Sequence, residues 1–269
     1  MAITTVDGLI GAARQRVRLL KTASITTIAT IPFSSLDVAG NPGAGSLTIG
    51  NTTAGLVPTD ATNGYPTITA FGGGATGYLQ SVEYGSSVAS RVTLYDRLWN
   101  SGSHALTPLR TDTITAPPSY ATRLPGTDYS GLEIFVEVNV VIPASAVTIT
   151  VNYINEDTVT AGVTASSGSL SGFTTRRLVP LPLQAGHKGV SRIVSVVVGG
   201  VVAATGSINV VVARRLWSGR VKIANDGALD GPDATGMPVV YDNSALWMVV
   251  ASDGTAGGIQ ELGLTVANG

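Results

Sequence analysis

The chain has 269 residues, of which 44% are hydrophobic and only 12% are charged. It contains 33 glycines and no cysteine, and its formal net charge at pH 7 is −1. Such a weak charge argues against a nucleic-acid partner, and the missing cysteines exclude disulfides, thiolate zinc sites and cysteine nucleophiles. The apolar residues are numerous enough to form a core, and the many β-branched and turn-forming residues favour an all-β domain over a disordered chain.

The first segment is amphipathic and ends in basic residues. In "TTVDGLIGAARQRVRLLKTAS" (4–24) apolar residues recur every three to four positions, which predicts a helix. Its charges follow its apolar residues, the reverse of a signal peptide, and no apolar run is long enough for a transmembrane helix, so we expect neither export nor a membrane partner. Residues 1–23 are predicted to form a short helix or arm that either packs on its own domain or reaches a neighbouring subunit. The cations in its second half are candidate contacts to an acidic surface: Arg14, Arg16, Arg18 and Lys21.

From residue 24 onward the pattern is one of strands and turns. The stretch 38–77 is rich in Gly, Thr, Pro and Asn and is too long for a hairpin loop, so we expect an excursion from the core whose simplest role is contact with another copy. Alternating or continuous apolar runs predict strands at 78–84, 88–99, 132–142, 147–155, 176–183, 190–198, 206–217, 244–254 and 259–268. This spacing favours a single jelly-roll-like β-sandwich with long loops over residues 24–269, and a two-domain division near 120–130 is the alternative.

Two predicted strands end in the same Arg-Leu-Trp sequence, followed by a Ser-Gly turn. They are "RVTLYDRLWNSG" (91–102) and "NVVVARRLWSG" (209–219). An Arg two residues before a Trp on one strand face can stack on the indole ring. A duplicated unit, a site that stacks a sugar or base, and a structural corner at one end of the sandwich or at an intersubunit seam are all compatible. We expect these strands to be neighbours or to meet across a subunit boundary, with these candidate interface residues: Asp96, Arg97, Trp99, Arg214, Arg215 and Trp217.

Residues suited to catalysis or metal binding do not form a recognised pattern. His104 and His187 lie in small-residue segments, which predicts exposed loop histidines. Glu133 and Glu137 share a strand face about 13 Å apart, beyond the roughly 5–9.5 Å that glycoside hydrolysis requires. Three aspartates in a Gly-rich loop favour a solvated acidic loop, with a calcium-type site as the alternative: Asp226, Asp230 and Asp233. We therefore predict no enzyme activity, no cofactor and no metal site.

The chain as a whole resembles structural proteins of tailed-bacteriophage virions. The features that carry the resemblance are the Ala/Thr/Gly/Val-rich composition, the opening segment, the "DVAGNPGAGSL" excursion and the "LYDRLW" and "ARRLW" strand ends. The resemblance implies a capsid decoration or cement protein, a homotrimer on the capsid surface whose partners are the major capsid protein and its own copies, assembled in the host cytoplasm. Open alternatives are a tail-associated or glycan-binding module that uses Trp99 and Trp217, a single-jelly-roll capsid protein, and a bacterial surface domain.

Overall fold

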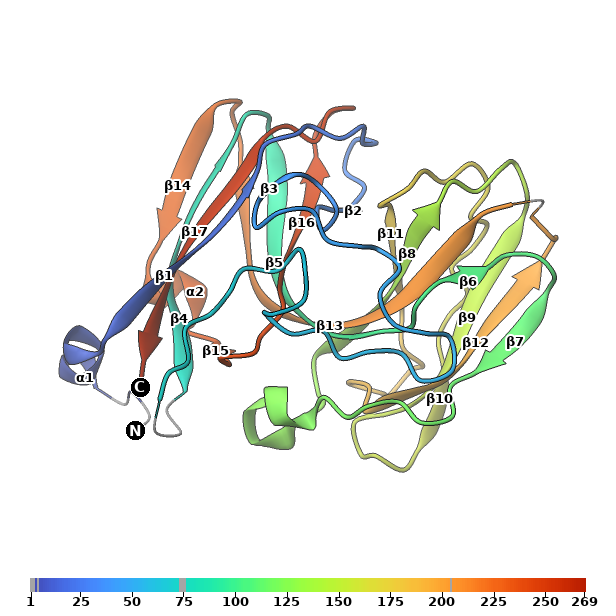
Figure 1. Cartoon of the computed structure of the whole chain (residues 1–269), viewed down its shortest axis with the longest axis horizontal. Coiled ribbons are helices and arrows are strands. Elements are labelled where there is room, and N and C mark those ends of the chain that lie inside the picture. Colours follow the sequence, from blue (N-terminus) through green and yellow to red (C-terminus); the bar gives the residue numbers. More distant parts are fainter. Residues whose placement is uncertain (1–2, 4, 73–75, 204) are drawn as a thin grey trace.

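A computed structural model describes the whole chain except residues 1–2, 4, 73–75 and 204. The described part is almost entirely β-structure, arranged in three antiparallel sheets (Figure 1). Its short helical elements are α1 (Val6–Gly11), η1 (Ala121–Arg123), η2 (Pro125–Thr127) and α2 (Pro232–Thr235). No described helix has the length and apolar character needed to cross a membrane. The predicted all-β class is confirmed.

The three sheets have six, seven and four strands. The β1 sheet contains β1 (Arg14–Lys21), β3 (Gly40–Asn41), β4 (Gly77–Ser86), β14 (Asp226–Asp230), β15 (Val239–Val240) and β17 (Gln260–Asn268). The central sheet contains β2 (Phe33–Ser34), β5 (Ser90–Asn100), β6 (His104–Ala105), β8 (Leu132–Val140), β11 (Leu178–Leu181), β13 (Ser207–Val221) and β16 (Leu246–Ser252). The β9 sheet contains β7 (Arg110–Thr113), β9 (Val147–Ile154), β10 (Ala161–Val163) and β12 (Arg192–Gly200).

Strands of the first two sheets are arranged as a jelly roll. The order β14-β4-β17-β1 in the β1 sheet faces the order β13-β5-β16-β2 in the central sheet. This arrangement of eight strands in two sheets is the double Greek key of a jelly roll. The layers enclose a core that includes Leu19, Leu79, Leu94, Met248 and Leu264. The predicted jelly-roll-like sandwich is therefore confirmed by the strand order.

A second lobe is inserted between β5 and β13. Residues 101–206 contain β6 to β12, and Figure 1 shows these strands gathered beside the jelly roll. There β8 and β11 extend the central sheet, and the β9 sheet packs on the extension around residues such as Val136, Tyr153 and Val196. Residues 120–130 fall within the inserted segment 101–206 in the sequence. The domain division of the chain stays a prediction, because β5 and β13 belong to both lobes.

The predicted excursion at 38–77 packs on its own chain. The strand that precedes the excursion, β2, lies at one edge of the central sheet, and β11 lies at the opposite edge. Phe33 of β2 nevertheless forms a β-bridge with Arg177, the residue that immediately precedes β11. The sheet therefore curves around a third cluster in which Leu47 and Tyr65 of the excursion cover aromatic residues such as Trp247. In Figure 1 the light-blue loops that follow β3 accordingly pass between the two lobes.

The prediction of a helix or arm over residues 1–23 is wrong in its second half. Thr5 caps α1 by accepting a hydrogen bond from Gly8 N at 3.0 Å, but the helix ends at Gly11. Strand β1 follows and pairs with β17 along its whole length, so the basic residues belong to the jelly roll. The reason is that this segment also alternates with period two: its arginines point outward while Val17 and Leu19 are buried, and the ladder to β17 satisfies its backbone.

Candidate functional site

The two Arg-Leu-Trp segments lie side by side, as predicted. They belong to β5 and β13, which are adjacent antiparallel strands. Leu98 and Leu216 are extra residues at two bulges in this pairing. A bulge changes which face the following side chains take, so the expected stacking of Arg97 on Trp99 does not form. Instead Arg97 stacks on Trp247, with its guanidinium carbon 4.9 Å from the ring centroid.

Asp96 is the centre of one buried ionic cluster. Its carboxylate accepts hydrogen bonds from Arg123, from Ser244 Oγ at 2.9 Å and from Ala245 N at 3.0 Å. Arg214 Nη2 lies 3.7 Å from Asp96 Oδ2, the oxygen that accepts the hydrogen bond from Ser244. Burial lowers the pKa of Arg214, and the charge of Asp96 opposes that shift. These partners of Asp96 all belong to the same chain, which agrees with the interpretation of the Arg-Leu-Trp segments as a structural corner.

Arg97 and Glu137 form a second ionic cluster on the curved side of the central sheet. Arg97 Nη2 lies 2.7 Å from Glu137 Oε2, and both side chains are fully buried. Asn209 Nδ2 donates to the same oxygen at 3.0 Å, and Asn100 accepts from Arg97. Burial opposes the charge on Arg97, but the neighbouring Glu137 raises the pKa of the guanidinium above its ordinary value.

Several candidate interface residues are thus interior residues. Trp99 and Trp217 are also buried, so neither presents a ring face on which a glycan could stack, and that prediction is wrong. Lys21 Nζ donates to the carbonyl oxygens of Val38 at 3.0 Å and Pro42 at 3.3 Å, and burial lowers the pKa of Lys21 to about 8. The candidates that remain on the surface, and whose interface role stays a prediction, are Arg14, Arg16, Arg18 and Arg215.

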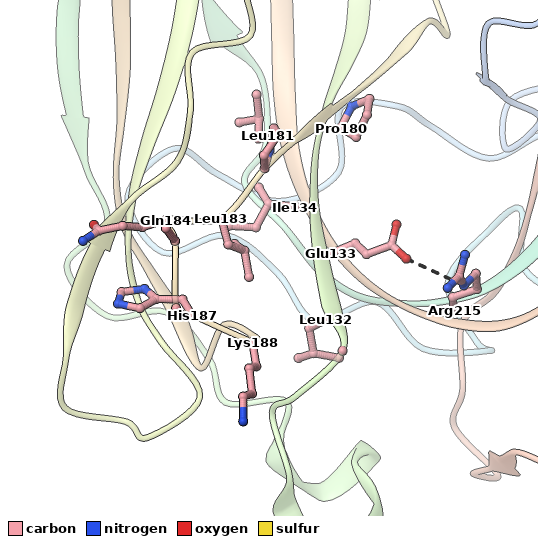
Figure 2. Close-up of a pocket in the computed structure, with 14 residues that line it drawn as sticks. Leu132, Glu133, Ile134, Pro180, Leu181, Leu183, Gln184, His187, Lys188 and Arg215 are labelled. Atoms are coloured by element: carbon pink, nitrogen blue, oxygen red, sulfur yellow. Dashed lines mark ion pairs between the residues drawn. The ribbon is translucent and has the colours of Figure 1, made fainter.

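Arg215 lines a cleft of about 540 Å³ beside β8 and β11. The other walls are residues 131–134 and 180–188. Figure 2 shows Glu133 pointing toward Arg215, and Arg215 Nε lies 3.8 Å from Glu133 Oε1. Tyr95 donates to Glu133 Oε2 at 3.2 Å, and burial together with this carboxylate raises the pKa of Tyr95. The side chain of Glu133 therefore lies between a phenol and a guanidinium.

The opposite side of the cleft carries His187 and Lys188, which Figure 2 shows away from Glu133. His187 Nδ1 lies 2.9 Å from the hydroxyl of Tyr153, and the same hydroxyl accepts a hydrogen bond from Gln184 N. This imidazole is thus tied to the wall of the cleft. Because Glu133 compensates the charge of Arg215, Lys188 is left as an exposed cation at this cleft.

The prediction that His104 is an exposed loop histidine is wrong. It belongs to β6, which pairs with β13, and it is fully buried with Nδ1 2.6 Å from Asp112 Oδ2. Burial lowers the pKa of His104, and Asp112 opposes the shift. The predicted acidic loop is also partly a strand, β14, in which Asp230 accepts a hydrogen bond from Trp217 Nε1 at 2.8 Å. Among the residues that the structure describes, no cluster of acidic and histidine side chains is suited to holding a metal ion.

Sequence reasoning missed Arg123, because it lies in an irregular segment whose local pattern carries no sign of an ionic role. The side chain is buried, and its partners come from positions far away in the chain. Only the folded chain brings them together.

No protein-family model matches this chain, and no curated protein matches it. Among solved structures, the VP2 subviral particle of infectious bursal disease virus is 11% identical, with a TM-score of 0.20 over 96% of this chain and 80% of that chain. The T=1 particles derived from the same virus are 9% identical, with a TM-score of 0.17 over 96% of this chain and 77% of that chain. TM-scores this low do not establish a common fold, and the jelly roll is recognised from the strand order of the two sheets.

Proposed function

We propose that this chain is a non-enzymatic structural subunit of a virus particle that assembles with copies of itself. The observation that carries the proposal is the order β14-β4-β17-β1 against β13-β5-β16-β2, with a second lobe inserted between β5 and β13. Jelly rolls build viral capsids, and they also occur in lectins and cupins, so the fold needs support from the surface.

Support for assembly comes from the far end of the inserted lobe. Val140 and Val141 are 51% and 52% exposed, and Val201 is 61% exposed. Val201 is hydrogen-bonded to the connection that follows Val141, because Val201 N donates to Ala146 O at 3.1 Å and Ser145 Oγ donates to Val201 O at 2.9 Å. Exposed valines beside both ends of the β8–β9 connection make this part of the lobe a candidate contact surface for another protein.

The finer question is whether the chain forms a shell or decorates one. The resemblance to bacteriophage decoration proteins favours a trimeric cement subunit that bridges major capsid subunits. That role was expected to use a basic arm, whereas Arg14–Lys21 is an internal strand of the sandwich. Because this basic segment is paired with β17 and is not a free arm, the shell-forming capsid subunit is favoured, and the decoration subunit is the second candidate.

The test is to purify the full chain and follow its assembly by analytical ultracentrifugation and negative-stain electron microscopy. Closed particles formed by the chain alone support the shell-forming role. A small, defined oligomer that binds bacteriophage heads lacking it supports the decoration role. A monomer that neither assembles nor binds such heads at high concentration overturns the proposal.

A further inference from the structure

The outer face of the β1 sheet carries charges of both signs at its two sides. Figure 1 shows this sheet as the outermost layer of the jelly roll. Residues directly opposite in paired strands share a face, and Arg18, Gly263, Glu83 and Leu229 form one such row across β1, β17, β4 and β14. Arg16 lies in the next row. The face is thus basic along β1 and acidic at β4.

Opposite charges flank a groove of about 560 Å³ on this face. Arg18 pairs with Glu261 at 2.6 Å, so these two charges compensate each other. Arg16 and Glu83 line the groove as well, and neither has a hydrogen-bond or ion-pair partner among the residues that the structure describes. Two opposite charges on one chain are therefore left for groups outside it.

Three glycines are among the residues that line the groove: Gly85, Gly227 and Gly263. A Cβ added at Gly85 would lie 3.7 Å from its nearest neighbour, and one at Gly263 would lie 3.5 Å from Glu83. A larger side chain could therefore begin at either position without a steric clash, and neither residue has the positive φ that would favour glycine. Glycine inside a strand weakens the strand, and it often marks a place where another backbone or a ligand approaches closely.

We propose that this face is an interface with a second copy of the chain. A two-fold axis that lies between the two faces and runs parallel to β17 places β1 of each copy over β4 of the other. This rotation keeps each row at its own level, so Arg18 of each copy then faces Glu83 of the other, and Gly263 lies near the axis. Arg16, which has no partner among the described residues of its own chain, comes within reach of the same Glu83 from the next row. This interface deepens the proposed function, because it names a surface through which copies meet.

The size of the face agrees with a moderate contact. The strands β1, β17, β4 and β14 have 8, 9, 10 and 5 residues and together cover about 500 Å². This is less than the roughly 800 Å² that each partner contributes to a stable interface of standard size. Such a contact gains strength when many copies assemble and each uses more than one surface.

Charge reversal tests the inference in the full chain. Arg16→Glu and Glu83→Arg each place like charges opposite one another, so each is expected to weaken the dimer by about tenfold or more in sedimentation velocity. The double variant Arg16→Glu/Glu83→Arg restores opposite charges and is expected to return the dissociation constant close to the original value. Arg192→Glu, an exposed reversal in the inserted lobe, is the matched control and is expected to change nothing.

Cross-linking gives an independent readout, because the chain has no cysteine of its own. Gly263→Cys is expected to yield covalent dimers with a short bis-maleimide, whereas Gly254→Cys in an exposed loop is not. A chain that stays monomeric, single reversals that leave the dissociation constant unchanged, or a double variant that does not recover would each overturn the interface. Particles that form normally from the single reversals refute this interface and leave the proposed function standing. A rescued dimer that neither assembles further nor binds bacteriophage heads refutes the proposed function alone.

Discussion

Asp96 of β5 lies directly opposite Arg214 of β13, yet its closest cation is Arg123 from the inserted lobe. Arg123 also donates to the carbonyl oxygen of Arg97 at 3.0 Å and to that of Pro58 in the excursion. One buried guanidinium therefore joins the jelly roll, the inserted lobe and the excursion.

This junction makes Arg123 a key residue for stability. Replacing it by Met leaves the buried carboxylate of Asp96 without its closest cation, and we expect the free energy of unfolding to fall by about 3–5 kcal/mol. Chemical denaturation measures the loss, and Arg192→Met on the surface is expected to change stability by no more than about 0.5 kcal/mol. A loss for Arg123→Met no larger than that of the control would mean that Arg214 alone compensates Asp96.

The pair Arg97–Glu137 is expected to show strong coupling. Arg97→Met and Glu137→Leu each leave one buried charge unpaired, whereas the double variant removes both. We therefore expect the double variant to lose less stability than the sum of the two single losses, by about 0.5–3 kcal/mol. A double-mutant cycle by urea denaturation measures this difference, and strictly additive losses would contradict the coupling.

Lys21 is expected to make stability depend on pH in the alkaline range. Burial lowers its pKa from 10.5 to about 8 in the folded chain, with Asp37 opposing the shift. Between these two values the unfolded chain binds more protons than the folded chain, so stability rises with pH, while below pH 8 the penalty of burying the charge is fully present. The difference in unfolding free energy between the original chain and Lys21→Met should therefore be flat from pH 6 to 7.5 and rise toward pH 10. A difference that stays flat up to pH 10 would show that the lysine is not desolvated.

Truncation separates α1 from β1. Removing residues 1–11 deletes only α1 and is expected to leave a soluble, cooperatively folded chain. Removing residues 1–21 deletes β1 and uncovers buried residues of β17 such as Leu262 and Leu264, so we expect aggregation or strong binding of a hydrophobic dye. Equal behaviour of the two truncated chains in melting and dye-binding measurements would contradict the assignment of β1 to the sandwich.

Much of the β-structure was predictable because side-chain alternation is a local property. The runs at 132–142, 147–155 and 259–268 match β8, β9 and β17 closely, since residues two apart share a face whatever the rest of the chain does. The two Arg-Leu-Trp strands were expected to be neighbours or to meet across a subunit boundary, and they pair within the chain. The segment 14–21 was not predictable, because its apolar residues fit both a helical and a strand period, and the partner strand β17 decides between them.

What the sequence by itself determined is the all-β class, the position of most strands and the shortage of surface charge, because each depends on composition or on neighbours along the chain. Only the tertiary structure decided that a second lobe interrupts the jelly roll, that bulges at Leu98 and Leu216 separate each Arg from its Trp, and that Arg123 reaches Asp96. These features depend on contacts between distant segments, and a single extra residue in one strand is enough to turn a side chain from one face of the sheet to the other.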